Sequence, residues 1–126
     1  MPLSPSLSSF SDRDHALFEA GIKLGSLYHQ FVGTPLSLLS LASLEKAIED
    51  SIRSQPYVED ISVKINEDHV QNQLNDLFQY TELKGSMLTV HAVIRYGSSK
   101  AFVSLEFDEK LNYPLMKIDK IEEEQP

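Results

Sequence analysis

Cysteine is absent from this sequence of 126 residues, and so are long hydrophobic runs. Without cysteine the chain has no disulfide framework, no thiolate zinc site and no cysteine nucleophile. No apolar run approaches the ~20 residues needed to cross a bilayer, and the first ten residues lack the basic start and apolar core of a signal peptide. These absences predict a cytoplasmic protein that is not embedded in a membrane.

Positive charge is scarce, because 11 Lys and Arg residues stand against 19 Asp and Glu residues, which gives a formal net charge of −8. Binding to DNA, RNA or an anionic lipid surface would bring like charges together, so we expect neither nucleic acid nor membrane as a partner. Histidine occurs four times, as His15, His29, His69 and His91, without the spacing of a ligand cluster. No metal site is therefore expected.

The length and mass, 126 residues and 14.2 kDa, fit a single domain that buries about two-thirds of its unfolded surface. Residues 1–10 are rich in Ser and Pro and are expected to form a loose tail. Residues 122–126 are expected to form an acidic tail, which leaves residues 11–121 as one domain.

Two helices are predicted in the N-terminal half. Ser11, as N-cap, precedes a helix from about Asp12 to Val32, which ends before Gly33. Its expected apolar face is Leu17, Leu24, Tyr28 and Phe31. A second amphipathic helix is expected from about Leu41 to Ser54.

Strands are predicted in the C-terminal half. Ile61, Val63 and Ile65 alternate with polar residues in a half-buried strand over Val58–Asn66. Residues Met87–Phe107 indicate an antiparallel hairpin around Gly97-Ser98-Ser99. A last strand is expected within Leu111–Ile121, and a short helix within Glu67–Phe78 carrying Val70, Leu74, Leu77 and Phe78. The fold class is α+β, with two N-terminal helices packed on a small, mainly antiparallel sheet.

Gly21 and Gly25 lie inside the first predicted helix, where each costs up to about 1 kcal/mol relative to Ala. Close packing against a neighbouring element or subunit explains such a pair, and so does space for a flat ligand. Glu19 and His29 lie ten residues apart on the same helix, about 15 Å along its axis. They therefore either grip opposite ends of a long ligand or serve different subunits' sites.

By residue type alone, Glu19 is a solvated helix charge and His29 a surface or capping residue, although an imidazole suits proton transfer. Gln55 precedes a proline at the end of the second helix, where an amide caps a carbonyl or holds a water. Tyr80 and Tyr113 are core aromatics or proton donors.

Five segments of the sequence resemble the archaeal type of dihydroneopterin aldolase, a family of pterin biosynthesis. They occur in the family's order and span about residues 14 to 118. The segments are Phe18-Glu19-Ala20-Gly21-Ile22-Lys23-Leu24-Gly25, Tyr28-His29-Gln30-Phe31 with Gly33-Thr34-Pro35, Gln55-Pro56-Tyr57-Val58-Glu59, Tyr80-Thr81-Glu82-Leu83-Lys84-Gly85 and Leu111-Asn112-Tyr113-Pro114-Leu115-Met116.

The resemblance implies a lyase that cleaves 7,8-dihydroneopterin into 6-hydroxymethyl-7,8-dihydropterin and glycolaldehyde by acid–base catalysis, without a metal or cofactor. By position, His29 and Gln55 would hold the water that acts as general base, Tyr80 would be the general acid, and Glu19 would anchor the pterin. Tyr113 would line the site. The pathway served would be that of methanopterin or of a folate.

The resemblance also implies a homo-oligomer, a tetramer, and the separation of Glu19 from His29 favours sites formed between subunits. Two alternatives stay open at this point. The chain could be a non-catalytic pterin-binding oligomer, or an epimerase that rejoins the cleaved fragments with the side chain inverted.

Overall fold

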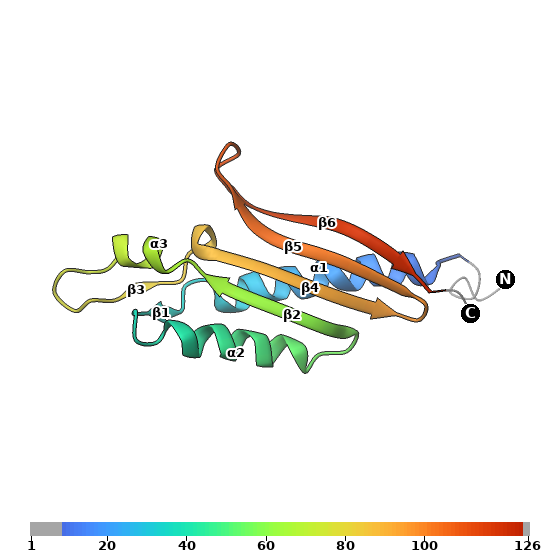
Figure 1. Cartoon of the computed structure of the whole chain (residues 1–126), viewed down its shortest axis with the longest axis horizontal. Helices are drawn as coiled ribbons and strands as arrows, with labels where there is room; N and C mark the ends of the chain where they lie inside the picture. Colours follow the sequence, from blue (N-terminus) through green and yellow to red (C-terminus); the bar gives the residue numbers. More distant parts are fainter. Residues whose placement is uncertain (1–8, 125–126) are drawn as a thin grey trace.

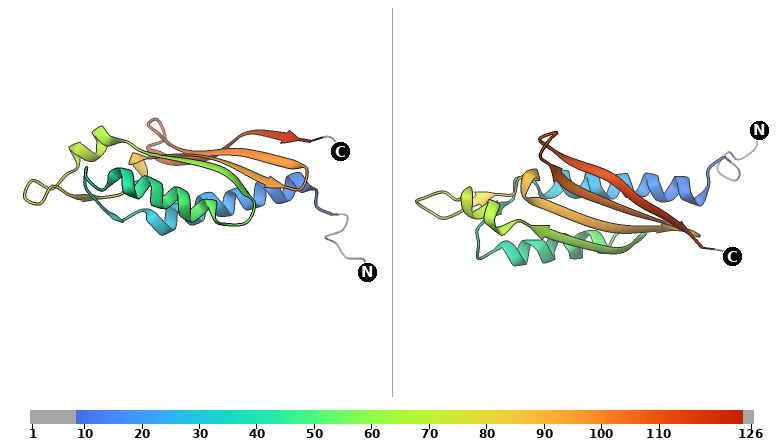
Figure 2. Two further views of the ribbon diagram at one scale, coloured as in Figure 1. Left: turned by 60° about the horizontal axis from the view of Figure 1, so that its bottom comes forward. Right: turned by 45° about the horizontal axis from the view of Figure 1, so that its top comes forward.

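The computed structural model describes residues 9–124 and shows two helices lying on one face of a four-stranded antiparallel sheet (Figure 1). The expected α+β class is confirmed. The strand order is β2-β4-β5-β6, and among the described residues no helix lies on the opposite face of the sheet (Figure 2). The main elements are α1 (Asp12–Phe31), α2 (Leu41–Arg53), β2 (Val58–Ile65), β4 (Leu88–Tyr96), β5 (Ser99–Asp108) and β6 (Tyr113–Glu123).

Helix α1 begins with a capping box. The Asp14 N–H donates to Ser11 Oγ and the Ser11 N–H donates to the Asp14 carboxylate, both at 3.1 Å, which pairs two N–H groups that the helix leaves without partners. The helix ends at Phe31, and Gly33 follows with a φ of +100°. Of the four residues of the expected apolar face, only Leu24 is fully buried. The buried residues of α1 are Ala16, Ala20, Lys23, Leu24 and Leu27.

Helix α2 lies along β2 and covers the outer edge of that strand. The carboxylate of Glu49 accepts the N–H of Val63 at 2.8 Å, and that of Glu45 accepts the N–H of Ile65 at 2.7 Å. Arg53 donates to the carbonyl of Ile61 at 2.9 Å. These side chains, spaced four residues apart, saturate backbone groups that an edge strand otherwise leaves open to pairing.

The β4–β5 hairpin is confirmed, with a two-residue turn at Gly97 and Ser98, whereas Ser99 already belongs to β5. Gly97 has a φ of +57°, a conformation suited to glycine. Asp12 at the start of α1 accepts hydrogen bonds from the N–H and hydroxyl of Ser98, at 2.9 and 3.1 Å. This contact fixes the first turn of α1 against the end of the hairpin.

The last strand is longer than expected, since β6 continues to Glu123, two residues into the segment expected to be an acidic tail. Glu124 also pairs with Arg95, at 2.6 Å. The remaining tail residues, 1–8 and 125–126, lie outside the described part of the chain, whereas Phe10 contacts the ring of His15.

Between β2 and β4 the chain departs from the expected helix. Helix α3 covers only Glu67–Asn72, with Val70 buried, whereas Leu77 and Phe78 are 77% and 71% exposed. The expected helical face through these two residues was therefore wrong. Downstream, β3 (Thr81–Glu82) pairs with β1 (Pro35–Leu36), and a 3-10 turn, η2 (Gly85–Met87), leads into β4. Within residues 9–124, no helix is both long and apolar enough to span a membrane.

Candidate active site

Glu19 lies in the first half of α1 and is held by Lys23, one helical turn later. The ammonium Nζ of Lys23 donates to Glu19 Oε1 at 2.8 Å. The Lys23 side chain is only 7% exposed, against 22% for Glu19. The cation is therefore the buried partner, and the carboxylate is the one that reaches the surface.

Beside Glu19, aromatic side chains border a hollow of about 680 Å³, a size typical of small-molecule pockets. Glu19 lines it together with Phe10, His15 and Phe18. The imidazole of His15 stacks on the ring of Tyr96, with centroids 4.4 Å apart. A carboxylate at the wall of an aromatic hollow suits a flat ligand that offers hydrogen-bond donors on one edge.

Gln55 is half-buried in the turn between α2 and β2, and its backbone N–H donates to the carbonyl of Ile52 at 3.0 Å. The same turn holds Tyr57, a non-glycine residue with a φ of +71°. The ring of Tyr57 lies 5.8 Å from the Lys23 ammonium and 5.0 Å from the ring of Tyr96. The turn of Gln55 is thus in contact with the Glu19–Lys23 pair.

His29 and Tyr80 lie at the other end of α1. His29 is exposed in the last turn of the helix. Tyr80 borders a shallow hollow of about 330 Å³ together with Gly33 and Pro35, which follow that helix. Helices α1 and α2 run in opposite directions (Figure 2), so the turn after α2 is remote from the end of α1.

Tyr113 begins β6, directly after the turn that joins it to β5, and it pairs with Asp108. Its side chain is exposed, and the turn protrudes beyond the sheet (Figure 1). Within one chain, the five predicted site residues therefore fall into three places. Glu19 and Gln55 form one group, His29 and Tyr80 a second, and Tyr113 stands apart from both.

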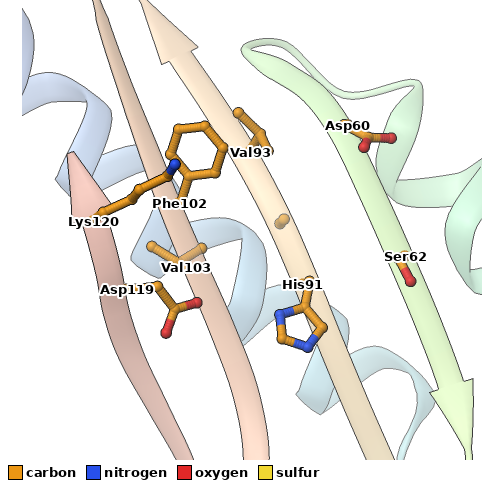
Figure 3. A pocket seen from close by; sticks show the side chains of 9 residues that line it. Asp60, Ser62, His91, Val93, Phe102, Val103, Asp119 and Lys120 are labelled. Carbon is orange, nitrogen blue, oxygen red and sulfur yellow. The ribbon is translucent and has the colours of Figure 1, made fainter. Parts of the chain in front are cut away.

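A third hollow lies on the sheet face that the helices leave open (Figure 3). Polar side chains from β2, β4 and β6 surround it, among them Ser62, His91 and Asp119. The ammonium of Lys120 lies 4.5 Å from the ring centroid of Phe102. None of the predicted site residues borders this hollow.

The most perturbed charges lie where the turn of Gln55 leads into β2, because the N–H of Arg95 donates to the carbonyl of Tyr57 in that turn at 2.9 Å. Arg95 donates to Glu59 at 2.9 Å and to Glu124 at 2.6 Å, and Lys100 pairs with Glu59 at 3.0 Å. The hydrogen bond from Arg95, followed by that from Lys100, lowers the pKa of Glu59, and Arg95 likewise lowers the pKa of Glu124. The two carboxylates raise the pKa of Arg95 in turn.

Sequence reasoning missed Lys23 and Tyr57. Two signals for Lys23 were present: it stands four residues after Glu19, which is ion-pair spacing, and it falls on the row of buried residues Ala16, Ala20, Leu24 and Leu27. A charged residue on a buried helix row needs a partner. The sequence contains no comparable signal for Tyr57. A tyrosine rarely adopts a positive φ, so nothing in the sequence indicates this backbone conformation.

Comparison with known proteins gives a consistent result. A family model described as dihydroneopterin aldolase matches residues 11–119. The dihydroneopterin aldolase of Methanopyrus kandleri is 45% identical over 112 residues, which cover 88% of this chain and 90% of that protein. That of Picrophilus torridus is 36% identical over 106 residues, or 84% and 86% of the two chains. A crystal structure of a protein from Picrophilus torridus superposes with a TM-score of 0.79 at 32% identity, over 98% of each chain.

Proposed function

This chain belongs to the dihydroneopterin aldolase family, and we propose that it assembles its active site from two subunits. As an aldehyde-lyase of this family, it cleaves 7,8-dihydroneopterin into 6-hydroxymethyl-7,8-dihydropterin and glycolaldehyde. The observation that carries this activity is the match over residues 11–119, together with two relatives of the same name that align over most of their length.

The substrate supplies its own electron sink. When the bond between C1′ and C2′ breaks, its electron pair moves into the conjugated imine at C6 and N5 of the pterin, and glycolaldehyde leaves with C2′ and C3′. The protein must remove the proton of the 2′-hydroxyl and deliver a proton to C1′. Each such proton transfer by a positioned group contributes typically 10²–10⁴-fold.

In our proposal His29 and Gln55 hold the water that takes the 2′-hydroxyl proton. An imidazole accepts a proton near neutral pH, while an amide both donates and accepts and so orients a water. Tyr80 delivers the proton to C1′, and Tyr113 lines the site.

Glu19 anchors the pterin ring. The N3–H and the 2-amino group form a planar pair of donors, which a carboxylate accepts with two oxygens. The aromatic hollow beside Glu19, bordered by Phe18 and His15, supports this role because a flat ring is accommodated against aromatic side chains.

Assembly from two subunits is supported by the separation of the residues. Glu19 and His29 are about 15 Å apart along α1, whereas a pterin with its three-carbon tail is on the order of 10 Å long. One chain therefore presents the anchor at one end and the imidazole at the other, and a second chain completes the site. The state that we propose is a cytoplasmic homotetramer.

The exposed face of α1 supports a contact between subunits. A Cβ atom added at Gly21 or Gly25 would meet nothing within 4 Å, so packing within the described part of the chain does not explain the pair. Phe18 and Ile22 lie on the same side of the helix and are 70% and 43% exposed, as expected of a face that another molecule covers.

The test is to incubate the chelator-treated protein with 7,8-dihydroneopterin and to measure both products by chromatography. Equal amounts of 6-hydroxymethyl-7,8-dihydropterin and glycolaldehyde are expected. Glu19→Gln should mainly raise KM, whereas His29→Ala, Gln55→Ala and Tyr80→Phe should mainly lower kcat. Tight pterin binding without turnover would instead indicate a binding protein, and an unchanged KM in Glu19→Gln would refute the anchoring role.

A further inference from the structure

We propose that Lys23 is a positioning residue for the pterin, because it fixes the carboxylate of Glu19 and links it to the turn that carries Gln55. This inference rests on the proposed anchoring of the pterin by Glu19. It adds a residue to which the reaction itself gives no role, and it concerns binding of the ring more than cleavage of the side chain.

Because Lys23 is buried, its ammonium group depends on Glu19 as a partner. An ammonium taken out of water requires a charged or hydrogen-bonded partner, and the partner within reach is Glu19 Oε1, at 2.8 Å. Lys23 is one of the buried residues of α1, together with Ala20, Leu24 and Leu27. The cation is therefore fixed by the fold, and the carboxylate takes its place from the cation.

The ligand-facing side of Glu19 remains available. A carboxylate has about four lone-pair sites, and the bond from Lys23 uses one of them on Oε1. Because Glu19 also lines the aromatic hollow, its remaining sites are available to a ring bound there. A carboxylate held in one orientation before the ligand arrives loses less conformational freedom on binding.

Tyr57 extends the contact to the second element of the site. Its ring lies 5.8 Å from Lys23 Nζ, within the range of a cation–π contact. Its carbonyl accepts the N–H of Arg95 at 2.9 Å, and its φ is +71°. A tyrosine keeps such a backbone only where its surroundings hold it. The turn that carries Gln55, two residues earlier, is thereby linked to Lys23 and through it to Glu19.

A purely structural ion pair is the competing explanation, and α2 offers the matched control. Lys46 and Asp50 have the same four-residue spacing and a similar distance, 2.9 Å, but are 76% and 55% exposed. Lys46→Met thus removes an ion pair of the same spacing on the helix surface, which borders none of the hollows described above.

The experiment compares Lys23→Met, Lys23→Arg, Glu19→Gln, the double variant Lys23→Met/Glu19→Gln and Lys46→Met. Each is assayed for kcat and KM with 7,8-dihydroneopterin, for the affinity of the product 6-hydroxymethyl-7,8-dihydropterin, and for its midpoint of thermal unfolding. Lys23→Met should weaken product binding and raise KM about tenfold, the size of one charge-assisted hydrogen bond. Its kcat should stay within about twofold.

Two further results are expected if Lys23 acts through Glu19. The double variant should bind the product no more weakly than Glu19→Gln alone, because the effects of coupled residues do not add. Lys23→Arg, which keeps the positive charge, should recover most of the affinity. Lys46→Met should bind and react as the wild type does.

Wild-type product affinity in a folded Lys23→Met variant, or full additivity in the double variant, would overturn the inference while leaving the aldolase proposal intact. Wild-type KM in Glu19→Gln would instead remove the anchoring role itself. If Lys23→Met does not fold, Lys23→Gln takes its place in the same cycle, since its amide still donates a hydrogen bond. An affinity that simply follows the unfolding midpoint across the variants also refutes a positioning role.

Discussion

Two variants that are inactive alone should restore activity when mixed, if the site is shared between subunits. His29→Ala removes the imidazole at the end of α1, and Gln55→Ala removes the amide in the turn after α2. In our proposal a site takes its imidazole from one subunit and its amide from another. A site built from one subunit of each variant then contains either both wild-type side chains or neither.

The size of the effect follows from counting. In an equal mixture with random assembly, the subunit that supplies the imidazole carries a wild-type His29 in half of the sites. The subunit that supplies the amide carries a wild-type Gln55 in half of the sites, independently. About a quarter of all sites should therefore be intact, and the mixture should reach about a quarter of wild-type kcat per chain.

The assay is to dissociate and reassemble the two variants together, and then to measure glycolaldehyde release against each variant reassembled alone. A matched control mixes His29→Ala with Tyr80→Phe. His29 and Tyr80 lie at the same end of the chain, so in our proposal both come from one subunit, and no intact site forms in this mixture. A mixture of His29→Ala and Gln55→Ala that is no more active than its components would refute the shared site, as would restoration in the control.

Three single substitutions test folding, subunit assembly and ion pairing separately. Glu49→Ala leaves the N–H of Val63 without its acceptor at the edge of the sheet. The free energy of unfolding should therefore fall by about 1–3 kcal/mol. An unchanged denaturation midpoint would contradict the stabilising role of the Glu49 carboxylate at the edge of β2. Gly25→Ala should leave folding intact or stabilise it by up to about 1 kcal/mol, yet lower the mass seen by light scattering; an unchanged mass would show that this face of α1 is not an interface. Arg95 lowers the pKa of Glu59, so the stabilisation from this pair is present above the ordinary pKa of 4.5 and is lost as the pH falls below it toward the lowered value. Glu59→Gln should therefore flatten the acid side of a plot of unfolding midpoint against pH, by a small amount because the pair is exposed, and a superimposable acid side would argue against the pair.

Much of the fold could be predicted because apolar residues recur in its helices and strands with the regular spacing of those elements. In β2, alternate residues Ile61, Val63 and Ile65 are buried as expected. The segment before β4 could not be predicted, because Leu77 and Phe78 continue the helical spacing of Val70 and Leu74, yet no element within residues 9–124 covers them. The pairing of β1 with β3 spans two residues in each strand, too few for any period to be detected.

Less of the site than of the fold could be predicted from the sequence. The proposed roles of Glu19, His29, Gln55 and Tyr80 come from resemblance to a family, since spacing alone left each with an ordinary alternative. What spacing did establish was the distance between Glu19 and His29, because a helix has a constant rise per residue. Lys23 could not be assigned from an apolar pattern, because a buried lysine interrupts such a face.

Two features of α1, its length and its exposed apolar face, both favour a site shared between subunits. Rigid helical geometry holds the backbones of Glu19 and His29 about 15 Å apart along the axis, more than the length of one pterin, which favours a proposed site completed by a second chain. The side of α1 away from the sheet bears exposed Phe18 and Ile22 beside Gly21 and Gly25, which are unfavourable in a helix unless something packs closely on them. A second subunit on this face would cover the apolar side chains and fill the space at the glycines. It would also bring a second helix, with its own His29, toward Glu19. If Gly25→Ala disrupts the oligomer, it should therefore also abolish the restored activity in mixtures of His29→Ala and Gln55→Ala.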